Sequence, residues 1–369
     1  MRGSLKVVLL LFAAAVSGCG GSGGSSGTPL PLPTLNSAPI DAIVQQNYAG
    51  GWGVELAIYK NGNPVYTHGY GFRDRGLPDI FNNSVPDFWN VPQPEQVLHL
   101  PRGQFAPDVN TVFHLASVSK EFTAGAILLL QQDGKLSVND PVSKYFPSIP
   151  NGQQIPLLYL LQHRSGLIDY NNFGDYPDFT GAYQAFMASG QTNYQPIVDR
   201  LASFPLKFTP GTAYDYENSN YFLLGQIVAK LSGETLAQFL QQRIFGPLGM
   251  VQTNQDLPPA PATDFALGYR DDGAGPYRTY EPNLRYYAGP GGMTSTVGDI
   301  ERWDRAVQHP GIFSQQSLAQ MFAPSPFPQP YGTYADGWFI SSLNGHPYIW
   351  HDGALRGFQT MNAISPTTP

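Results

Sequence analysis

Ser117-Val118-Ser119-Lys120 places a hydroxyl and an amine three positions apart at the start of a predicted helix. Residues three apart share a helix face, so the Lys120 amine is expected beside the Ser117 hydroxyl. A serine becomes a good nucleophile when a neighbouring base takes its proton. Lysine is such a base only when burial or nearby cations favour its neutral form. The pair therefore predicts acyl transfer through a serine ester, and two exposed helix residues are the alternative.

A second polar segment, Tyr216-Glu217-Asn218, lies ahead of an apolar helical pattern. It offers a phenol for proton transfer and an amide for orientation. Taken alone, it is equally a polar loop in which Asn218 or Ser219 caps the helix. The segment becomes informative only together with Ser117 and Lys120.

A third segment, His351-Asp352-Gly353-Ala354, follows an expected strand. Glycine at that place lets a ligand approach the strand backbone closely. The alternative is a surface histidine at the end of a strand.

The pattern of apolar residues predicts the elements that position these three segments. Asn61-Gly62 predicts a tight turn between strands at 54–59 and 65–70, and Asn344-Gly345 predicts another between late strands. Thr296 with Asp299 predicts a capping box. Strands are expected at 334–343, 347–351 and 357–365, and helices at 117–133, 152–163, 193–203, 220–232 and 235–244. Strands at both ends around a helical middle predict an α+β fold, with an antiparallel sheet formed by the chain ends and an inserted, mainly α-helical lobe.

The three motifs in this order resemble those of the serine β-lactamase and penicillin-binding protein superfamily, and they are most similar to its class C branch. That branch includes D-alanyl-D-alanine carboxypeptidases, D-aminopeptidases and family VIII esterases. Stretches at 160–167, 245–250 and 291–299 resemble structural signatures of the same branch. The resemblance covers residues 54–369 and implies a β-lactamase/transpeptidase-like fold with flanking helices.

The resemblance also implies roles for the residues of the first two motifs. Ser117 is expected to be the acylated nucleophile, and Lys120 and Tyr216 are expected to share the proton transfers. Asn218 is expected to position the substrate or Lys120. These roles describe a serine hydrolase without a metal or an organic cofactor.

The third motif departs from the pattern of many β-lactamases. His351 stands where they carry the lysine of Lys-Thr-Gly, so a fixed positive charge for a substrate carboxylate is missing near neutral pH. Gly353 matches the motif's glycine. By the same resemblance, the backbone N–H groups of Ser117 and Ala354 form the oxyanion hole, whose donors typically contribute about 3–4 kcal/mol each. The histidine favours an esterase or a D-peptidase over an efficient β-lactamase.

Three functions stay open at this point. The first is a serine hydrolase acting on esters or D-amino-acid peptides at the cell envelope. The second is a peptidase or β-lactamase directed at peptidoglycan-type substrates or β-lactams. The third is a non-hydrolytic or weakly active penicillin-binding envelope lipoprotein.

The first nineteen residues resemble a bacterial lipoprotein signal. Arg2 and Lys6 precede a short apolar run that ends in small residues before Cys19, the single cysteine of the chain. We expect secretion across the inner membrane and lipidation of Cys19, which would hold the protein in the envelope through a lipid anchor. An ordinary cleaved signal peptide is the alternative. The expected organisation is a signal at 1–19, a Gly/Ser/Pro linker at 20–39 and a hydrolase domain at 40–369.

Composition limits the partners. The formal net charge is −7 and Lys/Arg clusters are absent, so nucleic-acid binding is not expected. The seven histidines show no metal-ligating spacing, so a metal site is not expected. Members of the class C branch continue with a further sheet strand and a C-terminal helix. We therefore expect either that the chain lacks these elements or that something else covers that part of the sheet.

Overall fold

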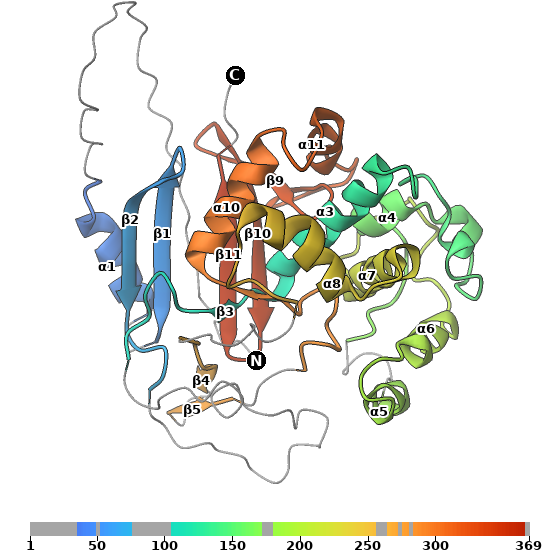
Figure 1. Cartoon of the computed structure of the whole chain (residues 1–369), viewed down its shortest axis with the longest axis horizontal. Helices are drawn as coiled ribbons and strands as arrows, with labels where there is room; N and C mark the ends of the chain where they lie inside the picture. The colour runs from blue at the N-terminus through green and yellow to red at the C-terminus, as the bar shows by residue number, and fades with distance from the viewer. Residues whose placement is uncertain are drawn as a thin grey trace, which may run out of the picture.

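Strands near the two ends of the chain lie beside a helical middle, as the sequence predicts (Figure 1). The computed structural model describes residues 35–48, 52–75, 105–171, 180–255, 264–271, 275–279 and 283–365. Cys19 and the signal lie outside these ranges, as does most of the linker. Among the helices that are described, none has both the length and the apolar character needed to cross a bilayer.

The predicted hairpins are present. Strands β1 (Val54–Lys60) and β2 (Asn63–Tyr70) pair antiparallel around Asn61-Gly62. Both turn residues have positive φ, 51° and 77°, which is why Asn and Gly occupy them. Asn344 and Gly345 form the equivalent turn between β9 (Phe339–Leu343) and β10 (His346–Leu355).

The strands from the two ends form two separate hydrogen-bonded sheets. The larger has the order β11-β10-β9-β8-β7, with β11 at Phe358–Ile364, β8 at Gly332–Tyr334 and β7 at Pro328–Gln329. The β1–β2 hairpin is a sheet of its own. Two short pairs complete the strands: β3 (Phe113–His114) with β6 (Thr294–Ser295), and β4 (Tyr269–Asp271) with β5 (Pro276–Arg278).

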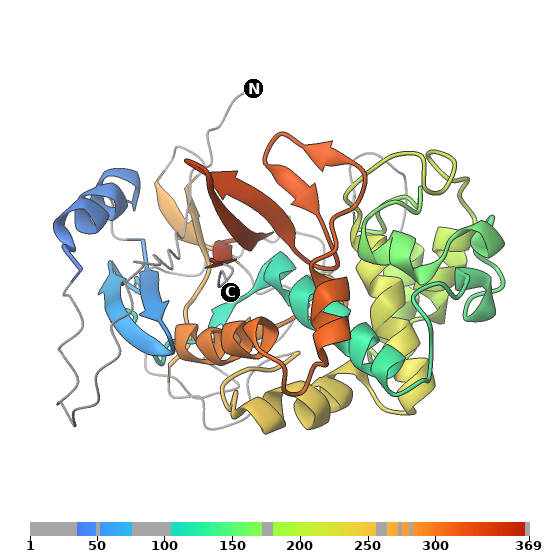
Figure 2. The same ribbon diagram turned by 90° about the horizontal axis from the view of Figure 1, so that it is seen from above.

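Helices form the second lobe and cover the sheet. In the view from above, α3 (Ser119–Gln132) and α10 (Val297–Gln308) lie on one side of the red strands, and the green and yellow helices form a lobe beside them (Figure 2). That lobe contains α4 (Leu157–Leu161), α5 (Thr180–Ala188), α6 (Gln195–Ala202) and α7 (Asn218–Ser232). The remaining helices are α1 (Ala38–Tyr48), α8 (Leu236–Leu240), a π-turn at Gln241–Phe245, α9 (Gly246–Leu248) and α11 (Gln315–Met321).

Several helix boundaries differ from the prediction for local reasons. The element expected at 152–163 is a 3-10 turn at Gly152–Gln154 followed by α4, because Pro156 separates them. The helix expected from residue 117 begins as a 3-10 turn, Ala116–Val118, before α3. At α10, Thr296 accepts the backbone N–H of Asp299 as a cap, but the Asp299 carboxylate binds Gln252 and Thr253 instead of completing a box.

Helix α3 is the centre of the core. Its residues from Ser119 to Leu130 are all buried, as expected for a helix that is apolar around most of its circumference. The Phe122 ring lies 4.3 Å from that of Trp303 on α10 and 5.6 Å from that of Phe245. These contacts hold α3 between the sheet and the helical lobe.

The turn ahead of α3 packs directly against β10. Strand β9 pairs with β10 only as far as Trp350, so the following residues of β10 lack a β9 partner. A Cβ atom on Gly353 would lie 2.3 Å from the Leu115 carbonyl oxygen and 2.9 Å from the Ser117 nitrogen. Thr360 of β11 also donates a hydrogen bond to the Leu115 carbonyl, at 2.7 Å. Only glycine lets β10 approach the turn this closely.

We expect Gly353→Ala to lower the free energy of unfolding by about 1–3 kcal/mol, because the added methyl forces the strand away from the turn. Urea denaturation measures the change. Gly181→Ala on α5 is the matched control: it meets no atom within 4 Å, and replacing a helical glycine by alanine stabilises by about 0.5–1 kcal/mol. Equal effects of the two substitutions would contradict the close contact at Gly353.

Candidate active site

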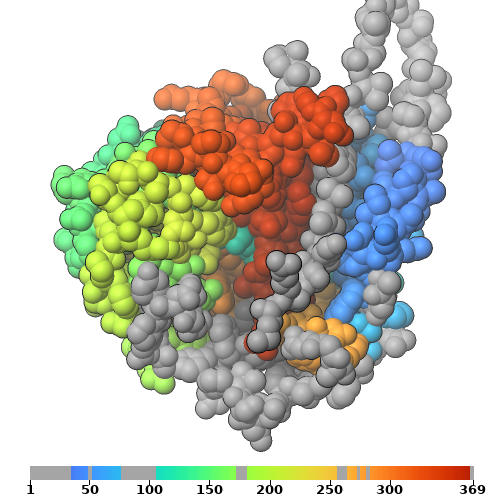
Figure 3. Space-filling view, turned by 180° about the vertical axis from the view of Figure 1, so that it is seen from behind, coloured from blue at the N-terminus to red at the C-terminus, as the bar shows by residue number. Residues whose placement is uncertain are grey.

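Ser117 lies at the boundary between the two lobes, on the 3-10 turn that precedes α3. Its neighbours Ala116 and Val118 are buried, whereas Ser117 itself is partly exposed. Ala116 has a φ of 49°, a left-handed conformation that costs an L-residue free energy and that often marks a functional turn. In the space-filling view the teal chain segment is visible at the bottom of a hollow between the yellow-green lobe and the red strands (Figure 3). Ser117 is thus accessible to a ligand, whereas the residues on either side of it in the turn are buried.

Lys120 is fully buried one turn later, and its Nζ has three oxygen partners. It lies 3.0 Å from Ser117 Oγ, 2.9 Å from Asn218 Oδ1 and 2.8 Å from the Pro290 carbonyl oxygen. These partners come from three different parts of the chain. The side chain therefore connects the α3 turn to the start of α7 and to the loop ahead of β6.

The environment of Lys120 favours a neutral amine. Burial lowers its pKa to about 7, and the charges of Asp169 and Asp352 oppose this only in part. A neutral amine has two N–H bonds and one lone pair. The oxygens of Asn218 and Pro290 can only accept, so they take the two N–H bonds. The lone pair then faces Ser117 Oγ, which is the arrangement that a general base requires.

Tyr216 lies beside Ser117, Lys120 and Asn218 and is the fourth polar side chain of the site. Lys120 Nζ lies 4.8 Å from the centroid of its ring. Burial raises the pKa of Tyr216 well above its usual value, and the interaction with the Ser117 hydroxyl lowers it only in part. The phenol therefore keeps its proton at neutral pH. The His163 ring packs against Tyr216 with centroids 4.3 Å apart.

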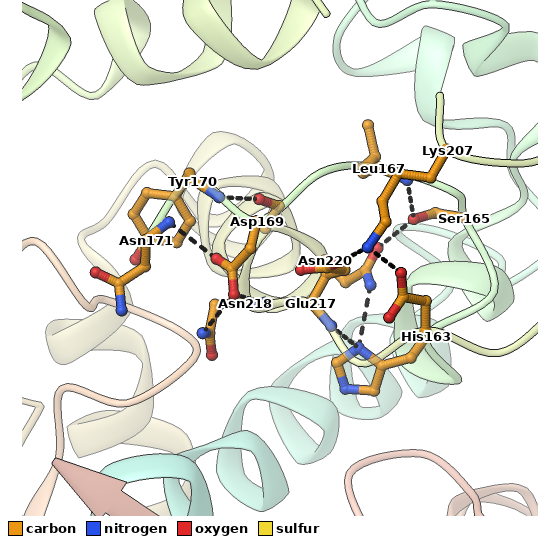
Figure 4. Close-up of polar contacts among 12 residues, drawn as sticks. His163, Ser165, Leu167, Asp169, Tyr170, Asn171, Lys207, Glu217, Asn218 and Asn220 are labelled. Carbon is orange, nitrogen blue, oxygen red and sulfur yellow. Dashed lines mark hydrogen bonds and ion pairs between the residues drawn. The ribbon is translucent and has the colours of Figure 1, made fainter. Parts of the chain in front are cut away.

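A network centred on His163 holds the 216–218 segment in place (Figure 4). His163 Nδ1 accepts the backbone N–H of Glu217 at 3.1 Å and lies 3.1 Å from Asn220 Nδ2. Burial lowers the pKa of His163 well below its usual value, so it acts as a neutral acceptor. Lys207 binds the Glu217 carboxylate at 2.6 Å. These contacts hold the backbone of the 216–218 segment against the His163 ring.

His351 forms part of the wall behind the site. Its Nδ1 donates to the Asp352 carbonyl oxygen at 2.6 Å, which leaves Nε2 to accept from the Tyr334 hydroxyl at 3.0 Å. Burial and the charge of Lys120 lower the pKa of His351 to about 3. The imidazole is 1% exposed and neutral. The structure therefore puts no positive charge at this position.

Gly353 and Ala354, further along β10, differ in how they lie relative to Ser117. Gly353 is buried against the Ser117 backbone, and Ala354 is exposed on the same stretch of the strand, beyond its pairing with β9. The structure thus brings Gly353 against the Ser117 turn, whereas the role of the Ser117 and Ala354 N–H groups as oxyanion donors stays a prediction.

Sequence reasoning missed two partners of this centre. The Pro290 carbonyl is a main-chain group, and main-chain acceptors leave no signal in the residue types. Asp169 accepts a hydrogen bond from the Asn218 amide at 3.0 Å. It lies two residues after the 160–167 signature, which is the signal that could have revealed it. Within the described ranges, no three His, Cys, Asp or Glu side chains gather in a way that could hold a metal ion.

Comparisons with known proteins agree with this geometry. A penicillin-binding protein of Bacillus subtilis strain 168 is 32% identical over 269 residues, 68% of this chain and 57% of its own length. Protein flp of Staphylococcus aureus is 26% identical over 340 residues, 89% of this chain and 60% of its own length. This chain spans less than two thirds of the curated relatives it matches.

Solved structures share the fold. The D-amino acid amidase of Ochrobactrum anthropi SV3 has a TM-score of 0.65 at 26% identity, over 87% of this chain and 84% of its own. The octameric penicillin-binding protein homologue from Pyrococcus abyssi has a TM-score of 0.69 at 22% identity, over 90% and 71%; at that identity it shows the fold alone. Residues 40–369 match the family described as Beta-lactamase. The chain therefore belongs to the β-lactamase family.

Proposed function

We propose that this protein hydrolyses esters, or amides and peptides of D-amino acids, through an acyl-enzyme on Ser117. The observation that carries the proposal is the buried Lys120 amine, 3.0 Å from Ser117 Oγ, with a pKa near 7. Such an amine is neutral in a large fraction of molecules at neutral pH. It can therefore accept the Ser117 proton without a costly prior deprotonation.

The reaction follows from these positions. Lys120 takes the hydroxyl proton as Ser117 Oγ bonds to the substrate carbonyl carbon, and the carbonyl oxygen becomes negative. The N–H groups of Ser117 and Ala354 are the proposed donors to that oxygen. When the bond to the leaving group breaks, the proton passes from Lys120, through or beside Tyr216, to the leaving oxygen or nitrogen. Water then attacks the ester and frees Ser117.

The charges around the site indicate which substrates suit it. His351 is neutral and buried, so it offers nothing to a substrate carboxylate. The Asp352 side chain beside it is 66% exposed and repels an anion. Substrates with a free amino group or a neutral acyl chain suit such a site better than carboxylated ones. The similarity to a D-amino acid amidase supports the same direction.

A slowly deacylating penicillin-binding protein is the second candidate, supported by the similarity to a penicillin-binding protein of Bacillus subtilis. Both candidates need the same acylation chemistry. They differ in the lifetime of the acyl-enzyme, which the following measurement resolves.

Ser117→Ala is expected to abolish covalent labelling by a penicillin and turnover of a p-nitrophenyl ester, because no other hydroxyl faces the Lys120 amine in the described site. Intact-protein mass spectrometry and ester absorbance measure the two. Ser119→Ala is the matched control: this hydroxyl is buried and accepts the Met293 N–H, so this variant should keep the ester turnover and the labelling of the wild type.

Wild-type results decide between the candidates. Fast ester turnover without a lasting penicillin adduct supports the hydrolase, and a persistent adduct with little turnover supports the penicillin-binding protein. Labelling that persists in Ser117→Ala would remove Ser117 as the nucleophile.

Acylation is expected to lose activity in acid with a midpoint near pH 7. Lys120 is the base only when deprotonated, and below its pKa the neutral fraction falls about tenfold per pH unit. The labelling rate at about pH 5 should therefore be roughly 100-fold below its plateau, measured by stopped-flow labelling with a neutral ester. Circular dichroism at the same pH controls for unfolding. A rate independent of pH between about 5 and 8 contradicts Lys120 as the base.

We also propose that the protein is held at the cell envelope by lipid on Cys19, which lies outside the described residues. The support is the signal-like sequence around this single cysteine. Cys19→Ser is expected to move the protein from the membrane fraction to the soluble fraction and to abolish incorporation of labelled palmitate in a bacterial host. Unchanged membrane association of Cys19→Ser would contradict the anchor.

A further inference from the structure

Asp169 lies next to the catalytic centre without touching the nucleophile. Its Oδ2 accepts the Asn218 side-chain amide at 3.0 Å and the Asn218 backbone N–H at 3.4 Å (Figure 4). Its Oδ1 accepts the backbone N–H of Asn171 at 2.9 Å. Both carboxylate oxygens are therefore engaged, one by its own loop and one by the first residue of α7.

The carboxylate decides which way the Asn218 amide faces. An ionised carboxylate has no hydrogen to donate, so only the NH₂ end of the amide can bind it. The carbonyl end, Oδ1, must then face Lys120, where it accepts the Nζ–H at 2.9 Å. A flipped amide would place its oxygen against the carboxylate and its NH₂ group against the amine. Asp169 thus determines that the Asn218 oxygen, a hydrogen-bond acceptor, faces the Lys120 amine.

The loop that carries Asp169 is itself fixed. The backbone N–H of Tyr170 donates to Ser219 Oγ at 2.8 Å, and the Tyr287 hydroxyl donates to Asn171 Oδ1 at 3.0 Å. The carboxylate also lies at the N-terminus of α7, where the helix dipole favours a negative charge. The loop and the first turn of α7 are therefore held together on both sides of the carboxylate.

We propose that Asp169 is a positioning residue for acylation: it fixes the Asn218 amide so that its oxygen orders the Lys120 amine toward Ser117. The proposal rests on the proposed function, because it assigns a role within the same acylation step. Asp169 acts on Lys120 in two ways, by orienting Asn218 and by its charge.

The charge of Asp169 adds to those of the other groups around Lys120. His351 and Asp352 face it from β10, His163 from the loop after α4, and Tyr216 and Tyr221 from the α7 segment, with ring centroids 4.8 and 5.7 Å from Nζ. The histidines are neutral and the phenols keep their protons, so the two carboxylates are the charges that raise the Lys120 pKa. Of these, Asp169 has the larger effect.

A double-mutant cycle tests the orienting role. Asp169→Ala should slow acylation of the full-length protein by a neutral p-nitrophenyl ester about 10- to 100-fold, and Asn218→Ala should slow it at least as much. If Asp169 acts through Asn218, adding Asp169→Ala to Asn218→Ala should change the rate less than about threefold. Asp199→Ala is the control, because this exposed carboxylate binds only its helix neighbour Gln195 among the contacts described.

Two results of the cycle would overturn the proposal. One is a wild-type rate in Asp169→Ala, and the other is a pair of effects that multiply in the double mutant. Absence of both ester turnover and labelling in the wild-type protein would instead be a failure of the proposed function, so the two failures are distinguishable.

Asp169→Asn tests the proposal if the alanine variant does not fold. The amide removes the charge while keeping the shape of the side chain. Because the carboxylate raises the Lys120 pKa, its loss should move the acid limb of the acylation rate to lower pH. A limb that stays at the wild-type pH would show that Asp169 is only a structural residue and would overturn the proposal.

Discussion

The site depends on one constraint: an amine must be kept out of water without being left unpartnered. Lys120 is fully buried, and a buried ammonium ion is costly unless it is paired. The protein meets this cost by supplying two acceptors and a hydroxyl, which is what a neutral amine can bind. The basicity needed for catalysis and the stability of the core are therefore set by the same burial. Changing the polarity around Lys120 alters both together.

The surrounding helices and turns place the hydrogen-bond partners of Lys120. Helix α3 carries the lysine and the 3-10 turn ahead of it carries the serine. The apolar surface of α3 buries it between the lobes. Helix α7 begins at Asn218, so an amide at its first turn reaches the amine. Two non-glycine residues with positive φ, Ala116 at 49° and His163 at 55°, lie beside the nucleophile and beneath the 216–218 segment. Such strain is maintained by the surrounding packing and is concentrated where positions must be fixed.

Much of this was accessible from the sequence. The turns at Asn61-Gly62 and Asn344-Gly345 were predictable because positive φ restricts the residue types. The motifs around Ser117 and Asn218 were predictable because side-chain chemistry and helix spacing specify them locally. The structure brings these motifs together, whereas the catalytic role of each residue stays a prediction.

The rest depended on tertiary structure. The Pro290 carbonyl could have come from any residue type, and the Asp169 carboxylate is near Asn218 only after folding. Helix α5 was not predicted, because it lies in an aromatic-rich stretch, 170–194, that shows no clear helical period. Both end sheets pair strands that are consecutive in sequence, whereas β3 and β6 pair across about 180 residues, and local pattern does not encode such distant pairing.

Because β10 packs closely against the turn that carries Ser117, the site can be completed only late in the synthesis of the chain. The ribosome completes Ser117, Lys120 and Asn218 long before the strand that contains Gly353, which follows Ser117 by more than 200 residues. Until that strand docks, the turn lacks one of its walls and one proposed oxyanion donor. A nascent or prematurely released chain therefore holds the nucleophile and its base but not the complete acylating centre. The proposed acylating centre is therefore complete only once the strand that contains Gly353 has docked on the Ser117 turn.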